Sequence, residues 1–276
     1  MSSGRGVRAR SVLMVVALVY IAALAATAIA APVVAPYDPT DQDYDARLLA
    51  PGSPGHLLGT DDLGRDVFSR IVWGSRAALL VGLVSVSIAL VIGLAIGLVA
   101  GLAGGRVEGA LMLLMDGILS FPTILLAIAV VTVFGYGLPQ VMAAIGFVFS
   151  PVFARLVRAE TLALKTEGYV ESARALGTPL WRITAVHIVP NMLGDLIVQC
   201  SVTFALAVVI EAGLSYLGLG TQPPNPSWGL MLKDARNYLF QASWLAIYPG
   251  VAIASTVLSF NVLGDTLAEH LNPLSR

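Results

Sequence analysis

The sequence has few of the residues from which catalytic and metal centres are built. Charged residues make up only 12% of the chain and hydrophobic residues 57%, where soluble domains average about 25% charged. Cysteine occurs once, at Cys200, so neither a disulfide nor a pair of cysteine metal ligands can form within the chain. Lysine occurs only at Lys165 and Lys233, and neither stands in the glycine-rich frame of a phosphate-binding loop. We therefore expect no metal site, no bound cofactor and no ATP site of that kind.

Histidine is also scarce. His56, His187 and His270 are the only ones, and all fall outside the membrane spans predicted below. A serine nucleophile within a span, such as Ser215, would need a histidine base that no span supplies. The net charge of −1 gives no support for nucleic-acid binding. These absences predict a protein that is not an enzyme and performs no bond chemistry itself.

Long uncharged stretches fill most of the chain instead. Several are long enough to cross a hydrocarbon layer of about 30 Å, which takes roughly 20 helical residues. Residues 135–139 break the longest of them with a turn signal rich in glycine and proline. The first apolar run, about 25 residues, exceeds the core of a signal peptide, so we expect it to be retained as an anchor. We predict an all-α polytopic membrane protein with six transmembrane helices, near residues 11–35, 76–103, 108–134, 139–157, 193–216 and 244–266.

The distribution of basic residues predicts the orientation. Inner flanks of membrane proteins collect Lys and Arg, so the basic leader places the N-terminus inside, and six crossings return the C-terminus to the same side. Ten basic residues then lie inside and five outside, with Arg76 at a boundary. The inner segments hold Arg5, Arg8, Arg10, Arg106, Arg155, Arg158, Lys165, Arg174, Arg182 and Arg276, and the outer segments hold Arg47, Arg65, Arg70, Lys233 and Arg236. We divide the chain into an N-terminal anchor with an extracytoplasmic segment, residues 1–75, and a core transmembrane domain, residues 76–276.

The inner segment 155–190 is too long to be a simple turn. Residues 170–176 are good helix formers, and Gly177 suits the left-handed residue that ends a helix. Thr178 followed by Pro179 is typical of an N-cap and a first helical position, and Pro190 is expected to end this second helix. The pattern predicts a helix–turn–helix on the cytoplasmic side. From the residues alone, two interpretations are open: the pair rests on lipid headgroups, or it docks onto a partner.

This inner segment closely resembles the EAA loop of permease subunits of bacterial ABC importers. The resemblance is carried by Glu171, Ser172, Ala173, Gly177, Ile188 and Pro190. Ser172 replaces the middle alanine of the family pattern, and His187 and Val189 replace an isoleucine and a leucine. Residues 56–67, with the sequence HLLGTDDLGRDV, and residues 211–229 narrow the resemblance to the C-type permease of the dipeptide, oligopeptide and nickel group.

The resemblance implies a permease that moves di- or oligopeptides across the bacterial inner membrane, with both termini cytoplasmic. It implies a heterodimer with a homologous permease, two cytoplasmic ATPase subunits that bind ATP and Mg, and an extracytoplasmic substrate-binding protein. It also implies that residues 171–177 dock into a groove on an ATPase. Import of nickel or another small solute is the alternative within this family. A stand-alone channel or ion-coupled carrier is the alternative outside it, which the shortage of intramembrane ionisable groups disfavours.

Two carboxylates, Asp116 and Glu211, fall within predicted spans. A charge there is costly, so each should face protein or water rather than lipid. One interpretation is that they line the substrate path, where a carboxylate would meet the ammonium group of a peptide. The other is that each forms a structural hydrogen bond to a neighbouring helix or subunit.

The outer segments supply a second set of candidates, grouped around the 56–67 sequence. Asp61, Asp62 and Arg65 predict a local ion-pair network that shapes the outer mouth, with contact to the binding protein as an equal alternative. Asp66 and Trp228 belong to the same set. Elsewhere, the GxxxGxxxG stripe that begins at Gly93 predicts close helix packing.

Overall fold

The computed structural model describes residues 3–271, with the side chains of residues 12–269. Arg276 and the side chains of Arg5, Arg8 and Arg10 lie outside the described part. Within it the regular elements are helices, apart from two isolated β-bridges between residues 53 and 66. The helices are α1 (Ser3–Ile29), α2 (Ala31–Val34), α3 (Val67–Ala103), α4 (Gly105–Leu119), α5 (Thr123–Phe134), α6 (Leu138–Leu164), α7 (Gly168–Ala175), α8 (Leu180–Ile183), α9 (Val189–Tyr216), α10 (Trp228–Ala235) and α11 (Trp244–Leu271), with short 3-10 turns at Tyr44–Ala46 and Arg236–Tyr238 and a π-helical turn at Thr184–Ile188.

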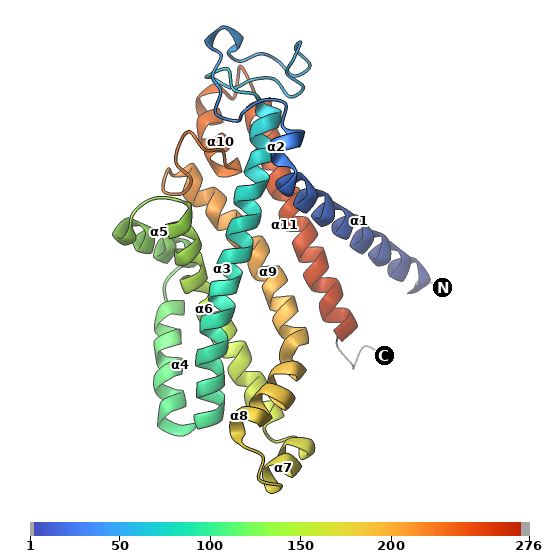
Figure 1. Cartoon of the computed structure of the whole chain (residues 1–276), viewed down its shortest axis with the longest axis vertical. Helices are drawn as coiled ribbons and strands as arrows, with labels where there is room; N and C mark the ends of the chain where they lie inside the picture. The colour runs from blue at the N-terminus through green and yellow to red at the C-terminus, as the bar shows by residue number, and fades with distance from the viewer. Residues whose placement is uncertain (1–2, 272–276) are drawn as a thin grey trace.

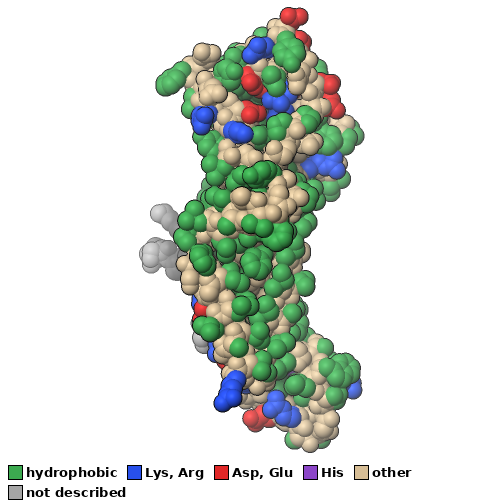
Figure 2. Space-filling model, turned by 90° about the vertical axis from the view of Figure 1, so that its left-hand side faces the viewer, with side chains coloured by type: hydrophobic (Ala, Val, Ile, Leu, Met, Phe, Trp, Pro, Cys, Tyr) green, Lys and Arg blue, Asp and Glu red, His purple; other side chains and the backbone are tan. Residues whose placement is uncertain are grey.

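The bundle has the composition of a membrane-spanning protein. Among the described residues, α1, α3, α6, α11 and the run from α8 through α9 are long and apolar enough to cross a membrane, and α4 with α5 makes a sixth span if this bent pair is counted as one. Hydrophobic side chains cover the middle of the face shown in Figure 2, while charged side chains gather at its two ends. The predicted all-α, multi-span fold is confirmed.

The third predicted span, 108–134, is wrong as a single helix. The chain bends by 92° between α4 and α5, and α5 turns away from the bundle (Figure 1). Ser120 caps α4 by donating its N–H to the Asp116 carbonyl, 3.0 Å away. Pro122 then has no N–H with which to continue the helix, and it disfavours helical geometry in the residue before it. Apolar sequence continues across this break, so hydropathy alone conceals it.

Other predicted boundaries also move, and α6 ends at Leu164 rather than near residue 157. α3 begins at Val67 rather than near residue 76, because the Asp66 carboxylate caps it by accepting the Ser69 N–H at 2.8 Å. Residues 75 and 76, where we divide the chain, therefore lie inside one continuous helix. The first span ends at Ile29 rather than near residue 35, and the chain turns there into the short helix α2.

α3 and α6 form the most extensive helix pair of the bundle, while α9 packs against both α3 and α11. The predicted glycine stripe accounts for this close packing. Its three glycines lie against the side chains of Phe153, Val157 and Thr161 of α6. The stripe therefore packs helices within the chain, as predicted.

The predicted helix–turn–helix is present as α7 and α8, with two corrections. Gly177 has φ of +76° and closes α7 as expected. The second helix does not end at Pro190. The N–H of Val189 bonds to the carbonyl of Thr184, five residues back, in the π-helical turn, and the chain continues as α9. Pro190 is tolerated because it stands in the first turn of that helix. Pro179, rather than Thr178, is the N-cap residue of α8.

Candidate functional site

The candidate residues lie at opposite ends of the bundle. The α7–α8 hairpin (residues 168–183) forms one end, and residues 36–66 with α10 form the other (Figure 1). Between them, Asp116 lies on α4 and Glu211 on α9. The structure therefore presents three separate groups of candidates rather than one centre.

The hairpin has a buried side and an exposed side. Val170 and Ile183 are buried, and Ile188 anchors the adjoining π-helical turn in the same core. In contrast, Leu176 is 86% exposed and Trp181 is 72% exposed. A large apolar surface on a short, anchored element is typical of a protein interaction site.

The predicted coupling residues divide between these two sides. Glu171 and Ser172 are exposed on α7, whereas Ala173 is half-buried beside the core. Pro190 lies at the start of α9. At Gly177 nothing lies within 4 Å of an added Cβ, so the positive φ rather than a lack of space requires glycine there.

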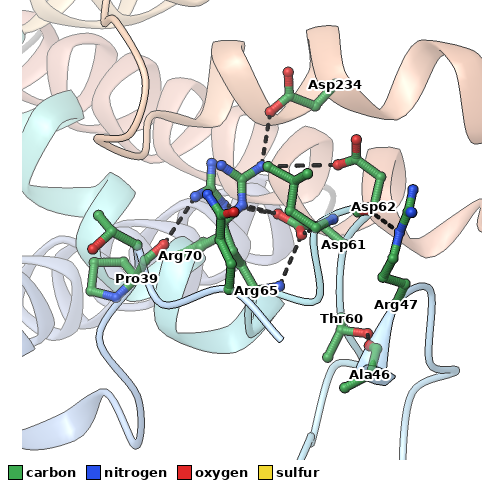
Figure 3. A network of polar contacts seen from close by, with 12 residues as sticks. Pro39, Ala46, Arg47, Thr60, Asp61, Asp62, Arg65, Arg70 and Asp234 are labelled. Carbon is green, nitrogen blue, oxygen red and sulfur yellow. Dashed lines mark hydrogen bonds and ion pairs between the residues drawn. The ribbon is translucent and has the colours of Figure 1, made fainter. Parts of the chain in front are cut away.

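The outer end is held by a network of charged side chains, which we call the outer junction: Asp61, Asp62, Arg65, Arg70 and Asp234 (Figure 3). The Asp61 carboxylate accepts hydrogen bonds from the Arg65 N–H at 3.0 Å and the Arg65 Nε at 2.7 Å. Arg65 Nη2 lies 3.4 Å from Asp234 and 3.9 Å from Asp62. Arg70 Nε lies 3.5 Å from Asp61, and its Nη1 donates to the Pro39 carbonyl at 3.0 Å. The junction thereby ties residues 36–66 to α3 and α10.

Two carboxylates of the outer junction are poorly solvated. Burial raises the pKa of Asp62 above its ordinary value, and the charge of Asp61 raises it further, against Arg65. Burial also raises the pKa of Asp234, although Arg65 and Arg70 oppose the shift. Burial of the two carboxyl groups, the first cause of both shifts, therefore outweighs their attraction to the guanidinium groups of this junction.

Sequence reasoning found Asp61, Asp62 and Arg65 but missed two members of the junction. Asp234 is separated from Arg65 by 169 positions, so no local pattern joins them. Arg70 was assigned only to an outer segment, yet it is 1% exposed, inside the first turns of α3. Its burial beside Asp61 depends on the fold, and no local pattern in the sequence predicts it.

Asp66 and Trp228 also lie inside the outer end. The Asp66 carboxylate caps α3 and lies 2.9 Å from His56 Nδ1. Trp228 is 3% exposed and donates its indole N–H to the Ile71 carbonyl at 3.1 Å. Both side chains therefore join outer segments to α3 rather than face outward.

The two intramembrane carboxylates have unlike surroundings. Glu211 is 2% exposed and accepts a hydrogen bond from Ser215 Oγ, 2.6 Å away on the same helix, so its carboxyl group faces protein. Asp116 is half exposed, and its Oδ1 accepts from Arg155 Nε at 3.1 Å and Nη2 at 2.5 Å. Asp116 borders a cleft of about 520 Å³ between α4 and α6. The bonds from Arg155 of the neighbouring helix α6 fit the structural interpretation of Asp116, and the open, charged cleft fits the path interpretation.

Comparison with known proteins agrees with this arrangement. A family model described as binding-protein-dependent transport system inner membrane component matches residues 93–276. A second, described as the N-terminal TM domain of oligopeptide transport permease C, matches residues 9–51. The chain belongs to the first family and is a multi-pass permease component of an ABC importer, as its motifs predicted.

Particular relatives refine this assignment. The chain is 43% identical over 260 residues to a glutathione transport system permease protein of Pectobacterium atrosepticum, covering 94% of this chain and 86% of that one. It is 44% identical over 264 residues to the dipeptide transport system permease protein of Escherichia coli (strain K12), covering 94% and 88%. An inward-facing structure of a methionine ABC transporter matches with a TM-score of 0.63 at 20% identity, over 74% of this chain and 97% of that one. This last likeness supports the fold.

Proposed function

We propose that the chain imports di- and oligopeptides across the cytoplasmic membrane, as one permease of a heterodimer driven by ATP hydrolysis on partner subunits. The observation that carries this proposal is the 44% identity to a dipeptide permease over nearly the whole chain. The glutathione relative fits the same cargo class, since glutathione is a short peptide.

The α7–α8 hairpin is the element that receives force from an ATPase subunit. Its exposed Leu176 and Trp181 supply an apolar contact surface, and Glu171 adds a charge beside it. Its buried side is fixed by Val170 and Ile183, so a displacement of the tip moves the adjoining helices as well. In this role the hairpin end faces the cytoplasm, and the termini lie on the same side.

The outer end meets the extracytoplasmic binding protein. The outer junction fastens residues 36–66 to α10 through Arg65 and Asp234 and to α3 through Asp61 and Arg70. Contact with a binding protein at this end is thereby linked to two helices of the bundle. Glu211 and Trp228 act as positioning residues that hold the adjoining segments.

Reconstitution tests the proposal. The complex with partner permease, ATPases and binding protein, in proteoliposomes, should accumulate labelled dialanine only when ATP and every partner are present. Accumulation of dialanine by this chain alone with ATP would contradict the proposal. Accumulation of nickel but no peptide by the complete complex would overturn the substrate assignment.

A further inference from the structure

The cleft between α4 and α6 is bordered by two ion pairs. At one edge Arg155 binds Asp116, and at the other Arg158 binds Glu108 through Nε at 2.6 Å. The cleft has a volume of about 520 Å³, and Gly109 and Met112 line it between the pairs. It therefore contains two positive and two negative groups facing a common space.

Helix geometry explains why a space opens between the pairs. At 1.5 Å per residue, Glu108 and Asp116 lie about 12 Å apart along α4, whereas Arg155 and Arg158 lie about 4.5 Å apart along α6. The two arginine side chains must therefore diverge to reach their carboxylates. Gly109 has nothing within 4 Å of an added Cβ, so the α4 wall stays open between them.

The pair nearer the middle of the membrane is open to a ligand. The side chains of Asp116 and Arg155 are 51% and 52% exposed. Since a charge in a predicted span should face water or protein rather than lipid, this exposed surface should not face lipid. Both hydrogen bonds from Arg155 end on Oδ1 of Asp116. Within the described residues no hydrogen bond reaches Oδ2. Exposed ion pairs contribute little to stability, so the charges of a ligand can exchange with this pair at small cost.

We infer that this cleft is a subsite for the charged ends of a short zwitterionic peptide, an inference that rests on the proposed function. Arg158, at the edge where Glu108 lies, binds the terminal carboxylate, and Asp116, at the opposite edge, binds the terminal ammonium group. A peptide of two or three extended residues spans about 7 to 10 Å, which fits between Asp116 and the Arg158–Glu108 pair, since the two carboxylates lie about 12 Å apart along α4. The four charges of the cleft sum to zero, as do those of the cargo, so neither carries an uncompensated charge when bound.

Direct binding tests the subsite. The complex with its partner permease and ATPases, held in nanodiscs without binding protein, is titrated with dialanine, dialanine amide and N-acetyl-dialanine. The wild-type complex should bind dialanine at least 10-fold more tightly than either blocked peptide. Arg158→Gln should abolish the preference over the amide, and Asp116→Asn the preference over the acetylated peptide. Arg106→Gln, which removes a cation from α4 outside the cleft lining, should leave both preferences intact.

A charge-swapped double variant separates binding from assembly. Asp116→Arg with Arg155→Asp retains an ion pair between α4 and α6, so the complex should assemble as wild type does. It places a guanidinium group on α4 where the peptide ammonium binds, so dialanine binding should fall at least 10-fold. Wild-type dialanine binding by the swapped variant would overturn the subsite, as would equal binding of the three peptides by the wild-type complex.

The subsite and the proposed function fail in different ways. If the complete complex with binding protein transports no dialanine, the proposed function is wrong. If that complex transports dialanine but the nanodisc complex shows no preference for free termini, peptide import stands and only the subsite is overturned.

Discussion

Gly97 of α3 lies so close to α6 that a Cβ at this position would stand 2.6 Å from the Val157 Cβ and 2.7 Å from the Ala154 carbonyl oxygen. Gly101 meets Thr161 one turn further along in the same way. Small residues on one helix face allow two backbones to approach closely, and in a membrane such packing is a main source of helix association. Within this tightly packed pair, α6 borders the cleft and leads into the α7–α8 hairpin.

A methyl group at position 97 should weaken the packing of α3 against α6. We expect Gly97→Ala to lower stability by about 1–3 kcal/mol, the usual cost of overpacking, because both neighbours belong to a packed helix. Thermal unfolding of the detergent-solubilised complex measures the loss. Gly250→Ala is the matched control, since Gly250 lies in a helix with nothing within 4 Å of an added Cβ. Equal midpoints for the two variants would show that α3 and α6 do not pack as described.

The sequence predicts the spans well because uncharged apolar runs have a direct physical cause in the lipid solvent. It predicts the turn at Gly177 because few residues other than glycine adopt a positive φ without strain. The 92° bend near Pro122 is harder to find, since the apolar run continues on both sides of it. The partnership of Arg65 with Asp234 is beyond any local pattern, because it depends on how α10 folds back over α3.

The turn at Gly177 gives a second prediction. A β-branched residue is strained at φ of +76°, so Gly177→Val should distort the tip of the α7–α8 hairpin. We expect peptide transport by the reconstituted complex to be abolished, while the ATPase subunits still bind ATP. Uptake of labelled dialanine and nucleotide binding, measured on the same preparation, check this result.

Two further variants isolate the cause. Gly177→Asn should retain more transport than Gly177→Val, because asparagine tolerates left-handed geometry. Gly168→Ala is the matched control, since Gly168 begins the same helix with open space around an added Cβ and no positive φ. Normal uptake by Gly177→Val would argue against a coupling role for the turn.

The outer junction gives a third prediction. Asp61 is the main carboxylate partner of buried Arg65 and also lies beside Arg70. Breaking a buried ion pair by removing one partner costs about 3–5 kcal/mol, so Asp61→Asn should loosen residues 36–66 while the spans stay folded. Hydrogen exchange in that segment should accelerate, with little change in α6. Asp45→Asn, at an exposed position of the same segment, should leave exchange unchanged, and equal exchange in the two variants would contradict the junction's role.

The raised pKa of Asp62 predicts how stability changes with pH. In the unfolded chain this carboxyl titrates near 3.8, and burial together with the charge of Asp61 raises its pKa in the fold. The folded state therefore binds the Asp62 proton more tightly than the unfolded state does. The protonated carboxyl group adds to the free energy of unfolding below pH 3.8, and this contribution is lost as the pH rises through the raised pKa. Asp62→Asn removes this loss, so its thermal midpoint relative to wild type should be higher at pH 7 than at pH 3.8. The backbone carbonyl of Asp62, which accepts from Arg47 Nε at 2.6 Å, remains in the variant. A midpoint difference that is the same at both pH values would show that the carboxyl group is freely solvated.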